Sequence, residues 1–190
     1  KDLIRLSSRD DLIWYVVEEV VGQLGLVDCV IYLYDEDRDI LIQKAAYGAK
    51  RSVDGGVEGA IELPIGKGIT GTVAQTQEAI IIKDTTTDPR YVLDLASMQS
   101  EITVPITLQG KLYGIIDSEH PEKGFYTQAH LDFLSTIATM LASRLAQWQA
   151  HEALARQSPE SAIERAIKAT ADWTALPPDA YLRGEAVMRI

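Results

Sequence analysis

Three carboxylates in the stretch Ser100–His120 are the best candidates in this chain for binding or catalytic chemistry. The stretch consists of two β-branched, apolar-rich runs, with Glu101 near the start of the first and Asp117 and Glu119 near the end of the second. Carboxylates are uncommon on central strands unless they face a solvated or ligand-filled cavity. This set therefore predicts a pocket for a cation or an amine. The other interpretation is that the acids stay solvated at the sheet margin or cap nearby loop amides.

The register of the two runs decides whether these acids share a face. A glycine-containing break between such runs predicts an antiparallel hairpin. Asp117 and Glu119 share one strand face by the two-residue period. A strict two-residue turn sets Asp117 opposite Ile102, whereas a bulge at Gly110 sets it opposite Glu101. We favour the bulge, because glycine is the second residue of the turn, and we expect Glu101 to join the other two acids.

Cysteine and histidine usage excludes several classes of site. Cys29 is the only cysteine, so the chain has no internal disulfide, Cys-based zinc site or CxxC redox pair. We expect Cys29 to be a small buried hydrophobe rather than a reactive thiol. The three histidines are scattered without metal-ligand spacing. The sequence therefore predicts no metal and identifies no cofactor.

Composition places the chain among soluble globular proteins. Its 190 residues are 46% hydrophobic and 24% charged, enough for one domain with an extension. The net charge of −10 argues against contact with nucleic acid or anionic lipid by this segment. The longest apolar runs, such as Ala79–Ile82, fall far short of the roughly 20 residues of a membrane span. We therefore expect a cytoplasmic protein without membrane contact.

Hydrophobic periodicity and turn residues predict the order of the elements. Apolar residues recur at three- and four-residue spacing over Asp10–Leu24, which predicts a helix capped by Ser7 or Ser8. A strand hairpin over Val27–Tyr34 and Ile40–Tyr47 follows. The later expected elements are a strand at Ala60–Ile65, a short helix at Thr70–Gln77, a strand at Ala79–Lys83, a loop at Asp84–Ser100 with a helical turn near Tyr91–Met98, the acidic hairpin, and a long helix after Thr127.

The long helix carries a heptad-like seam, interrupted by Glu152, through Leu134, Ala138, Leu141, Leu145, Trp148, Glu152 and Ala155. The seam has two interpretations: the first half of the helix packs on the sheet, or the helix forms a dimer stalk. We expect a homodimer through the terminal helices. We place the domain at residues 1–157 and a helical tail or linker at 158–190.

The motifs in this order resemble those of the GAF domain family over Asp10–Leu145. The resemblance rests on the segments Tyr32-Leu33-Tyr34-Asp35, Gly66-Lys67-Gly68-Ile69-Thr70-Gly71, Ser100-Glu101 with Val104-Pro105-Ile106, Gly114-Ile115-Ile116-Asp117 and Phe125-Tyr126-Thr127. It implies an α+β, PAS-related fold. In that fold a central antiparallel sheet has terminal helices packed on one face and a loop-covered pocket on the other.

The resemblance also implies a regulatory function. GAF domains commonly act as small-molecule sensors or dimerisation modules in signal-transduction proteins. We expect a sensor with its pocket between the sheet and the 84–100 loop, serving an effector (kinase, cyclase or transcription regulator) outside this chain. The alternative is a ligand-free structural dimerisation module. The expected ligand-binding residues are Glu101, Asp117, Glu119, Thr103, Cys29, Leu33 and Asp84.

One enzymatic branch of the family bears on catalysis. The acids Glu101, Asp117 and Glu119 match the set with which free methionine-sulfoxide reductases hold the amino group of their substrate. That branch uses cysteines in the loop before the Ser-Glu strand, where this chain has Ser97 and Met98. A thiol regenerated by disulfide exchange needs a partner, which Cys29 lacks. We therefore expect no reductase activity and no enzyme.

Overall fold

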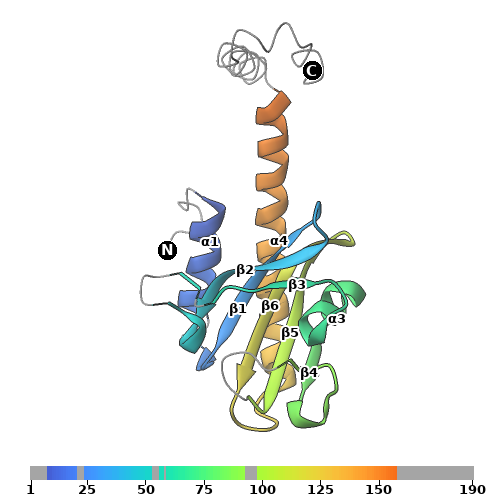
Figure 1. The fold of residues 1–190 in the computed structure, drawn as a ribbon. Helices are drawn as coiled ribbons and strands as arrows, with labels where there is room; N and C mark the ends of the chain where they lie inside the picture. The colour runs from blue at the N-terminus through green and yellow to red at the C-terminus, as the bar shows by residue number, and fades with distance from the viewer. Residues whose placement is uncertain (1–7, 21–23, 53–55, 58, 93–97, 158–190) are drawn as a thin grey trace, which may run out of the picture. The chain divides into compact units, whose positions relative to one another are not determined.

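The computed structural model describes residues 8–20, 24–52, 56–57, 59–92 and 98–157 (Figure 1). The chain forms two units, Lys1–Ala146 and Gln147–Ile190. The elements are α1 Arg9–Tyr15, η1 Val16–Val20, β1 Cys29–Asp35, β2 Ile40–Tyr47, η2 Gly48–Lys50, β3 Glu62–Pro64, α3 Gly68–Thr76, β4 Ile80–Ile82, η3 Thr85–Thr87, β5 Ser100–Leu108, β6 Lys111–His120 and α4 Gln128–Gln157.

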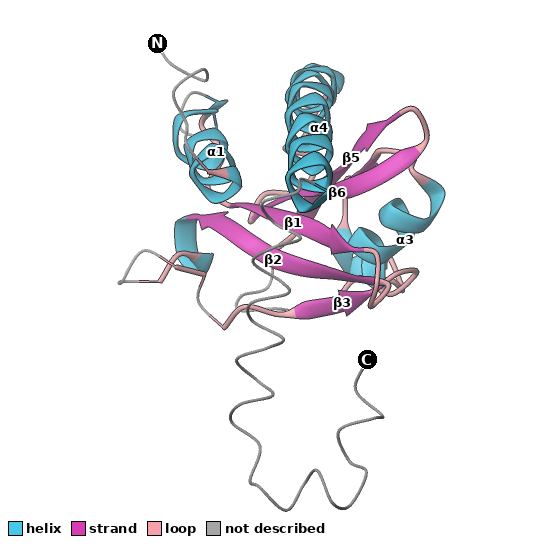
Figure 2. Cartoon of the chain, turned by 90° about the horizontal axis from the view of Figure 1, so that it is seen from above, coloured by secondary structure: helices cyan, strands magenta, loops and turns pink. Residues whose placement is uncertain are grey.

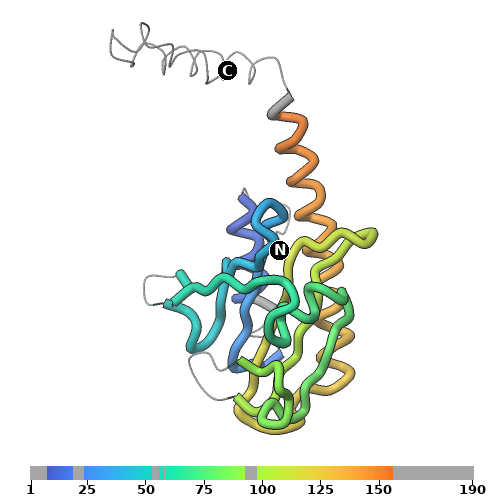
Figure 3. The backbone as a smooth tube through the Cα atoms, turned by 45° about the vertical axis from the view of Figure 1, so that its right-hand side comes forward, coloured from blue at the N-terminus to red at the C-terminus, as the bar shows by residue number. Residues whose placement is uncertain are grey.

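A six-stranded antiparallel sheet in the order β3-β2-β1-β6-β5-β4 is the centre of the fold. Two hairpins, β1–β2 and β5–β6, meet where β1 pairs with β6, so segments more than 80 residues apart become neighbours, as in the pair of Val30 and Asp117. Figure 3 shows the β5–β6 hairpin beside β1. The expected α+β architecture with a central antiparallel sheet is confirmed.

Helices α1 and α4 lie on one face of the sheet (Figure 2). Strand alternation directs Ile31, Ile102 and Ile116 to this face, and all three are buried. On α4, the seam residues Leu134, Ala138, Leu141 and Leu145 are at most 3% exposed. These seam positions therefore pack within the domain, which is the first of the two interpretations of the seam.

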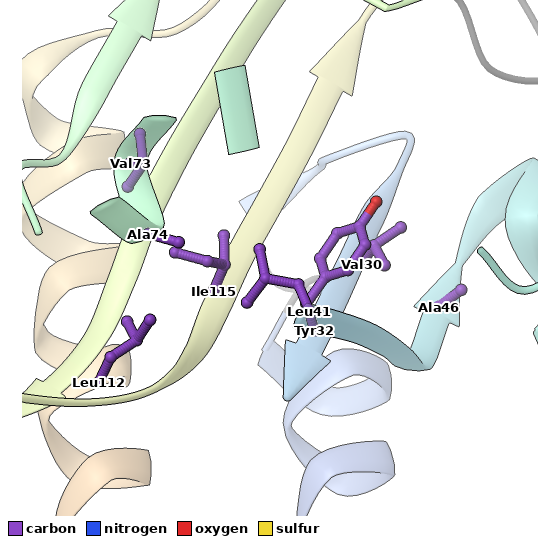
Figure 4. Close-up of a cluster of buried hydrophobic side chains, with 8 residues drawn as sticks. All are labelled: Val30, Tyr32, Leu41, Ala46, Val73, Ala74, Leu112 and Ile115. Carbon is purple, nitrogen blue, oxygen red and sulfur yellow. The ribbon is translucent and has the colours of Figure 1, made fainter. Parts of the chain in front are cut away.

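Helix α3 packs over the opposite face of the sheet. Its Val73 and Ala74 form a buried cluster with Tyr32 of β1 and Ile115 of β6 (Figure 4). The remaining members of the cluster are Val30, Leu41, Ala46 and Leu112. This apolar cluster fixes α3 against the strands that carry the acidic residues.

The N-terminal helix differs from the expected uninterrupted Asp10–Leu24. Helix α1 ends at Tyr15 and the chain continues as the π-helical segment η1. Ser8 provides the cap, since its Oγ accepts a hydrogen bond from the Asp11 amide at 3.0 Å. The tail at 158–190 and most of the expected turn near Tyr91–Met98 lie outside the described residues.

The turn of the acidic hairpin corrects the predicted register. Gln109 and Gly110 have φ values of +52° and +79°, the pattern of a two-residue type I′ turn, and Leu108 pairs with Lys111. The prediction of a bulge at Gly110 is therefore wrong. The register shifts further along the hairpin, where Ile106 pairs with Gly114 and Thr107 with Leu112, which leaves Tyr113 as the extra residue.

This bulge in β6 brings the acids to one face by a route that the sequence analysis did not weigh. Asp117 lies opposite Thr103, and Glu119 lies opposite Glu101. A one-residue shift in either direction from the strict register gives the same face, so the shared face was predicted correctly from a wrong pairing. Gly114 adjoins the bulge, and a Cβ there would lie 2.1 Å from the Tyr32 carbonyl oxygen, so β1 packs too closely for a side chain.

Candidate functional site

A cavity of about 230 Å³ lies on the α3 side of the sheet. Strands β1, β5 and β6 and the turn after β2 supply its polar wall, Tyr32, Lys50, Glu101, Asp117 and Glu119. Its apolar lining is Ile61, Leu63, Ile69 and Val92, and Lys67, Gly68 and Thr70 line it from the start of α3. The cavity thus combines one charged wall with an apolar lining, which is the usual character of a small-molecule site.

The acids on β5 and β6 are deeply buried and linked by a hydroxyl. Glu101, Asp117 and Glu119 are 3–4% exposed. Thr103 Oγ1 lies 2.8 Å from Asp117 Oδ1 and 3.1 Å from Glu101 Oε1. Its single hydrogen can be donated to one carboxylate at a time. The structure therefore brings together Glu101, Thr103, Asp117 and Glu119, four of the predicted site residues.

Lys50 belongs to the site and was missed by the sequence analysis. It ends the turn η2 after strand β2 and is 5% exposed. Its Nζ donates a hydrogen bond to Glu119 Oε2 at 2.6 Å. Gly48 makes the turn possible: its φ is +79°, and a Cβ would lie 2.2 Å from the Val27 carbonyl oxygen. The sequence signal was this glycine, which directly follows the predicted strand Ile40–Tyr47.

Asp28, just before β1, is a second missed residue. Its side chain is 1% exposed, and neither carboxylate oxygen has a hydrogen-bond partner among the described residues. Its Oδ2 lies 4.0 Å from Lys50 Nζ, beyond hydrogen-bond range. Its backbone is fixed, because the Ser118 hydroxyl donates to the Asp28 carbonyl oxygen. A buried carboxylate without a hydrogen bond is costly, so its environment must favour protonation or a cation.

Burial and mutual repulsion shift the pKa values of these groups. Burial raises the pKa of Asp28 to about 7 and that of Asp117 to about 6, although Lys50 opposes both shifts. Burial, with Asp117 and Glu119 nearby, raises the pKa of Glu101 well above its usual range. Burial lowers the pKa of Lys50, but Asp117, Asp28 and Glu119 outweigh it and raise the pKa overall. The cluster thus holds one cation among carboxyl groups that tend to keep protons.

Three predicted site residues lie elsewhere. Strand alternation places Cys29 and Leu33 on the helix-covered face, opposite Tyr32 and the cavity. Burial raises the pKa of the Cys29 thiol well above its usual value, as expected for an inert buried cysteine. Asp84 caps η3 through the Thr86 amide and pairs with Lys123 at 2.7 Å. The structure therefore places none of these three residues in the lining of the cavity.

The part of the chain that the structure describes contains no group of three or more His, Cys, Asp or Glu arranged to hold a metal ion. The same residues include no helix long and apolar enough to cross a membrane.

Comparison with known families decides the class of the fold. The profile of the GAF domain family matches residues 7–146. The chain belongs to the GAF domain family. Among curated GAF relatives, protein YtsP of Bacillus subtilis is 30% identical over 92 residues, covering 48% of this chain and 56% of YtsP. The free methionine-R-sulfoxide reductase of Saccharomyces cerevisiae is 24% identical over 140 residues, covering 72% of this chain and 71% of the enzyme. The chain thus spans little more than half of YtsP.

Solved structures share the GAF fold. The GAF domain of a phosphoenolpyruvate-protein phosphotransferase from Coxiella burnetii superposes with a TM-score of 0.69 at 22% identity, covering 78% of this chain and 89% of that one. The free methionine-R-sulfoxide reductase of Neisseria meningitidis, solved with its substrate, gives 0.67 at 19% identity, covering 77% and 83%. A GAF domain of a phosphotransferase and a reductase therefore share this architecture.

Proposed function

We propose that this GAF domain is a regulatory module that binds a small molecule carrying a protonated amino group. The observation that carries the proposal is the convergence of Glu101, Asp117 and Glu119 on one wall of the cavity. Buried carboxylates that outnumber their resident cation favour another positive group.

The volume of the cavity and the residues that line it beside the acids support a ligand of the size of an amino acid. Its volume of about 230 Å³ suits a compact molecule. Lys67 and the first residues of α3 also line the cavity, and a positive side chain and a helix N-terminus favour a negative group there. A zwitterion matches this distribution of charge. The names of the reductase relatives, which act on a free amino acid, agree with that class.

We infer that the module is not an enzyme. Because some of its relatives are methionine-sulfoxide reductases, reductase activity is the first activity to assay. The only cysteine of the chain, Cys29, is buried on the face of the sheet away from the cavity. Thiol-dependent reduction needs an accessible thiolate and a second thiol to resolve it. With methionine sulfoxide and a thiol reductant, we expect no turnover. Turnover abolished by Cys29→Ser would overturn this inference.

Calorimetric titration with a panel of free amino acids, including methionine sulfoxide, tests the binding proposal. Native mass spectrometry of the purified protein looks for a ligand that co-purifies. We expect Asp117→Asn to weaken binding at least about tenfold, the effect of one lost charge-assisted hydrogen bond. The matched control is Asp84→Asn, which removes a carboxylate outside the cavity and should leave affinity unchanged.

Absence of a co-purified mass and of binding by any free amino acid would overturn the sensor proposal in favour of a ligand-free dimerisation module. We propose that signalling passes through the terminal helices of a homodimer to an effector domain outside this chain. An apolar groove between α1 and α4 supports this route.

A further inference from the structure

The buried ammonium group of Lys50 is the unusual feature of this cavity. Lysine is seldom fully buried, and its charge is costly to desolvate unless it is paired. Here the side chain is 6% exposed and reaches Glu119 at 2.6 Å. The residue comes from a turn 69 positions away in sequence. Its Nζ therefore stands among the carboxylates that form the cation site.

We propose that Lys50 is a tethered occupant of this cation site, and that an external ammonium group binds there by displacing it. This inference extends the proposed function. Only the identity of the natural ligand depends on that function. Lys50 supplies the protein's own ammonium group in the absence of a ligand. Binding is then an exchange of one ammonium for another, so the affinity for a ligand is the difference between two similar interactions.

Asp28 shows that the resident ammonium does not satisfy the site. The carboxylate of Asp28 is 1% exposed, faces Lys50 Nζ at 4.0 Å, and has no hydrogen-bond partner in the described part of the chain. One ammonium has three N–H donors, whereas Asp28, Glu101, Asp117 and Glu119 offer many more acceptor sites. A cation free to choose its position could contact Asp28, whose Oδ2 lies 4.0 Å from Lys50 Nζ.

The backbone that carries Lys50 supports the exchange. The residue lies in a short 3₁₀ turn rather than in a strand. Its neighbour Arg51 pairs with Glu18 at 2.6 Å through half-exposed side chains, and such surface pairs hold weakly. Displacement of Lys50 thus requires a local rearrangement of one turn, and the sheet that carries the acids can stay unchanged.

Truncation of Lys50 followed by chemical rescue tests the proposal. Lys50→Ala removes the stem and the ammonium, and n-propylammonium has the atoms that are lost. We expect n-propylammonium chloride to raise the Tm of Lys50→Ala in a saturable way. Its apparent Kd should be lower for this variant than for the wild type by about tenfold or more, the value of one charge-assisted hydrogen bond.

Three controls separate a specific cation site from general effects. Lys67→Ala removes the same charge from the same cavity, but Lys67 is exposed and its ammonium is not among the buried acids. n-Propanol fills the same space without charge, and sodium chloride matches the ionic strength. We expect none of these combinations to reproduce the rescue.

The possible results decide the proposal. It is overturned if n-propylammonium binds the wild type, Lys50→Ala and Lys67→Ala equally, or if n-propanol rescues as well as the amine. If Lys50→Ala does not fold alone, refolding with n-propylammonium but not with n-propanol supports the proposal, and Lys50→Met with ammonium chloride repeats the test. Because these probes need no natural ligand, a wild type that binds no amino acid would overturn the proposed function and leave this result standing.

Discussion

The cavity wall concentrates acid groups with different protonation preferences. Burial raises the pKa of Asp117 to about 6, so this residue is ionised at pH 7.5, whereas the pKa of Glu101 is raised well above its usual range. Thr103 contacts both carboxyl groups. Of these two carboxyl groups, Glu101 has the higher pKa and therefore keeps its proton to higher pH than Asp117.

Glu101→Gln should therefore be tolerated where Asp117→Asn is not. An amide imitates a protonated carboxyl group, so the glutamine variant is expected to bind an amino ligand within about threefold of the wild type and to fold equally well. Calorimetry and thermal denaturation at pH 7.5 measure both properties. A loss of affinity equal to that of Asp117→Asn would show that Glu101 is charged.

The pKa of Asp28 makes stability depend on pH. Its folded value of about 7 lies above the ordinary 3.8, so the folded protein binds more protons than the unfolded chain between these pH values. Its contribution to stability is complete below about pH 4 and is lost as pH rises through 7. Urea unfolding from pH 5 to 8 should show a shallower decline for Asp28→Asn than for the wild type, and parallel curves would contradict the prediction.

At the scale of elements, two hairpins and one turn build the site. The β6 bulge places Asp117 opposite Thr103, and the turn η2 brings Lys50 to Glu119. The β6 bulge and the turn η2 each depend on a glycine, and the reason that glycine is required differs between them. Gly114 has no room for a Cβ beside the Tyr32 carbonyl oxygen, and Gly48 has both a positive φ and no room.

Gly48 and Gly110 form a matched pair for testing the η2 turn. Both have φ +79°, but a Cβ at Gly48 would lie 2.2 Å from the Val27 carbonyl oxygen, whereas Gly110 has no atom within 4 Å. Gly110→Ala should cost about 1–2 kcal/mol through its backbone conformation. Gly48→Ala should lower the free energy of unfolding further and weaken amine binding, because the turn that carries Lys50 must move. Equal effects in urea unfolding and calorimetry would contradict the steric argument.

For the whole molecule, the cavity connects to the N-terminal helix through adjacent residues. Lys50 reaches into the acids, and Arg51 lies 5.5 Å from the Trp14 ring centroid and pairs with Glu18. Occupation of the cavity should therefore alter Trp14 fluorescence in a protein whose other two tryptophans, Trp148 and Trp173, are replaced by Phe. Arg51→Ala should remove the response. A ligand that binds by calorimetry without changing Trp14 emission would contradict this link.

An apolar groove of about 280 Å³ between α1 and α4 bears on assembly. Leu12 and Val16 line one side, and Ile137, Met140 and Leu141 line the other. Met140 is 49% exposed there, which is unusual for a large apolar residue unless another surface covers it. If the homodimer forms through these helices, Met140→Glu should give a monomer by analytical ultracentrifugation. Thr139→Glu, the same charge at an exposed neighbour outside the groove, should stay dimeric.

The sequence by itself determined the order of the elements and the common face of Asp117 and Glu119, because strand alternation and turn chemistry are local properties. It also excluded a resolving cysteine. Only the tertiary structure decided the rest: the bulge at Tyr113, which face of β1 the helices cover, and the entry of Lys50 beside Asp28 and Glu119. Those features depend on how closely β1 packs against β6 and on a contact 69 positions apart, which no local pattern encodes.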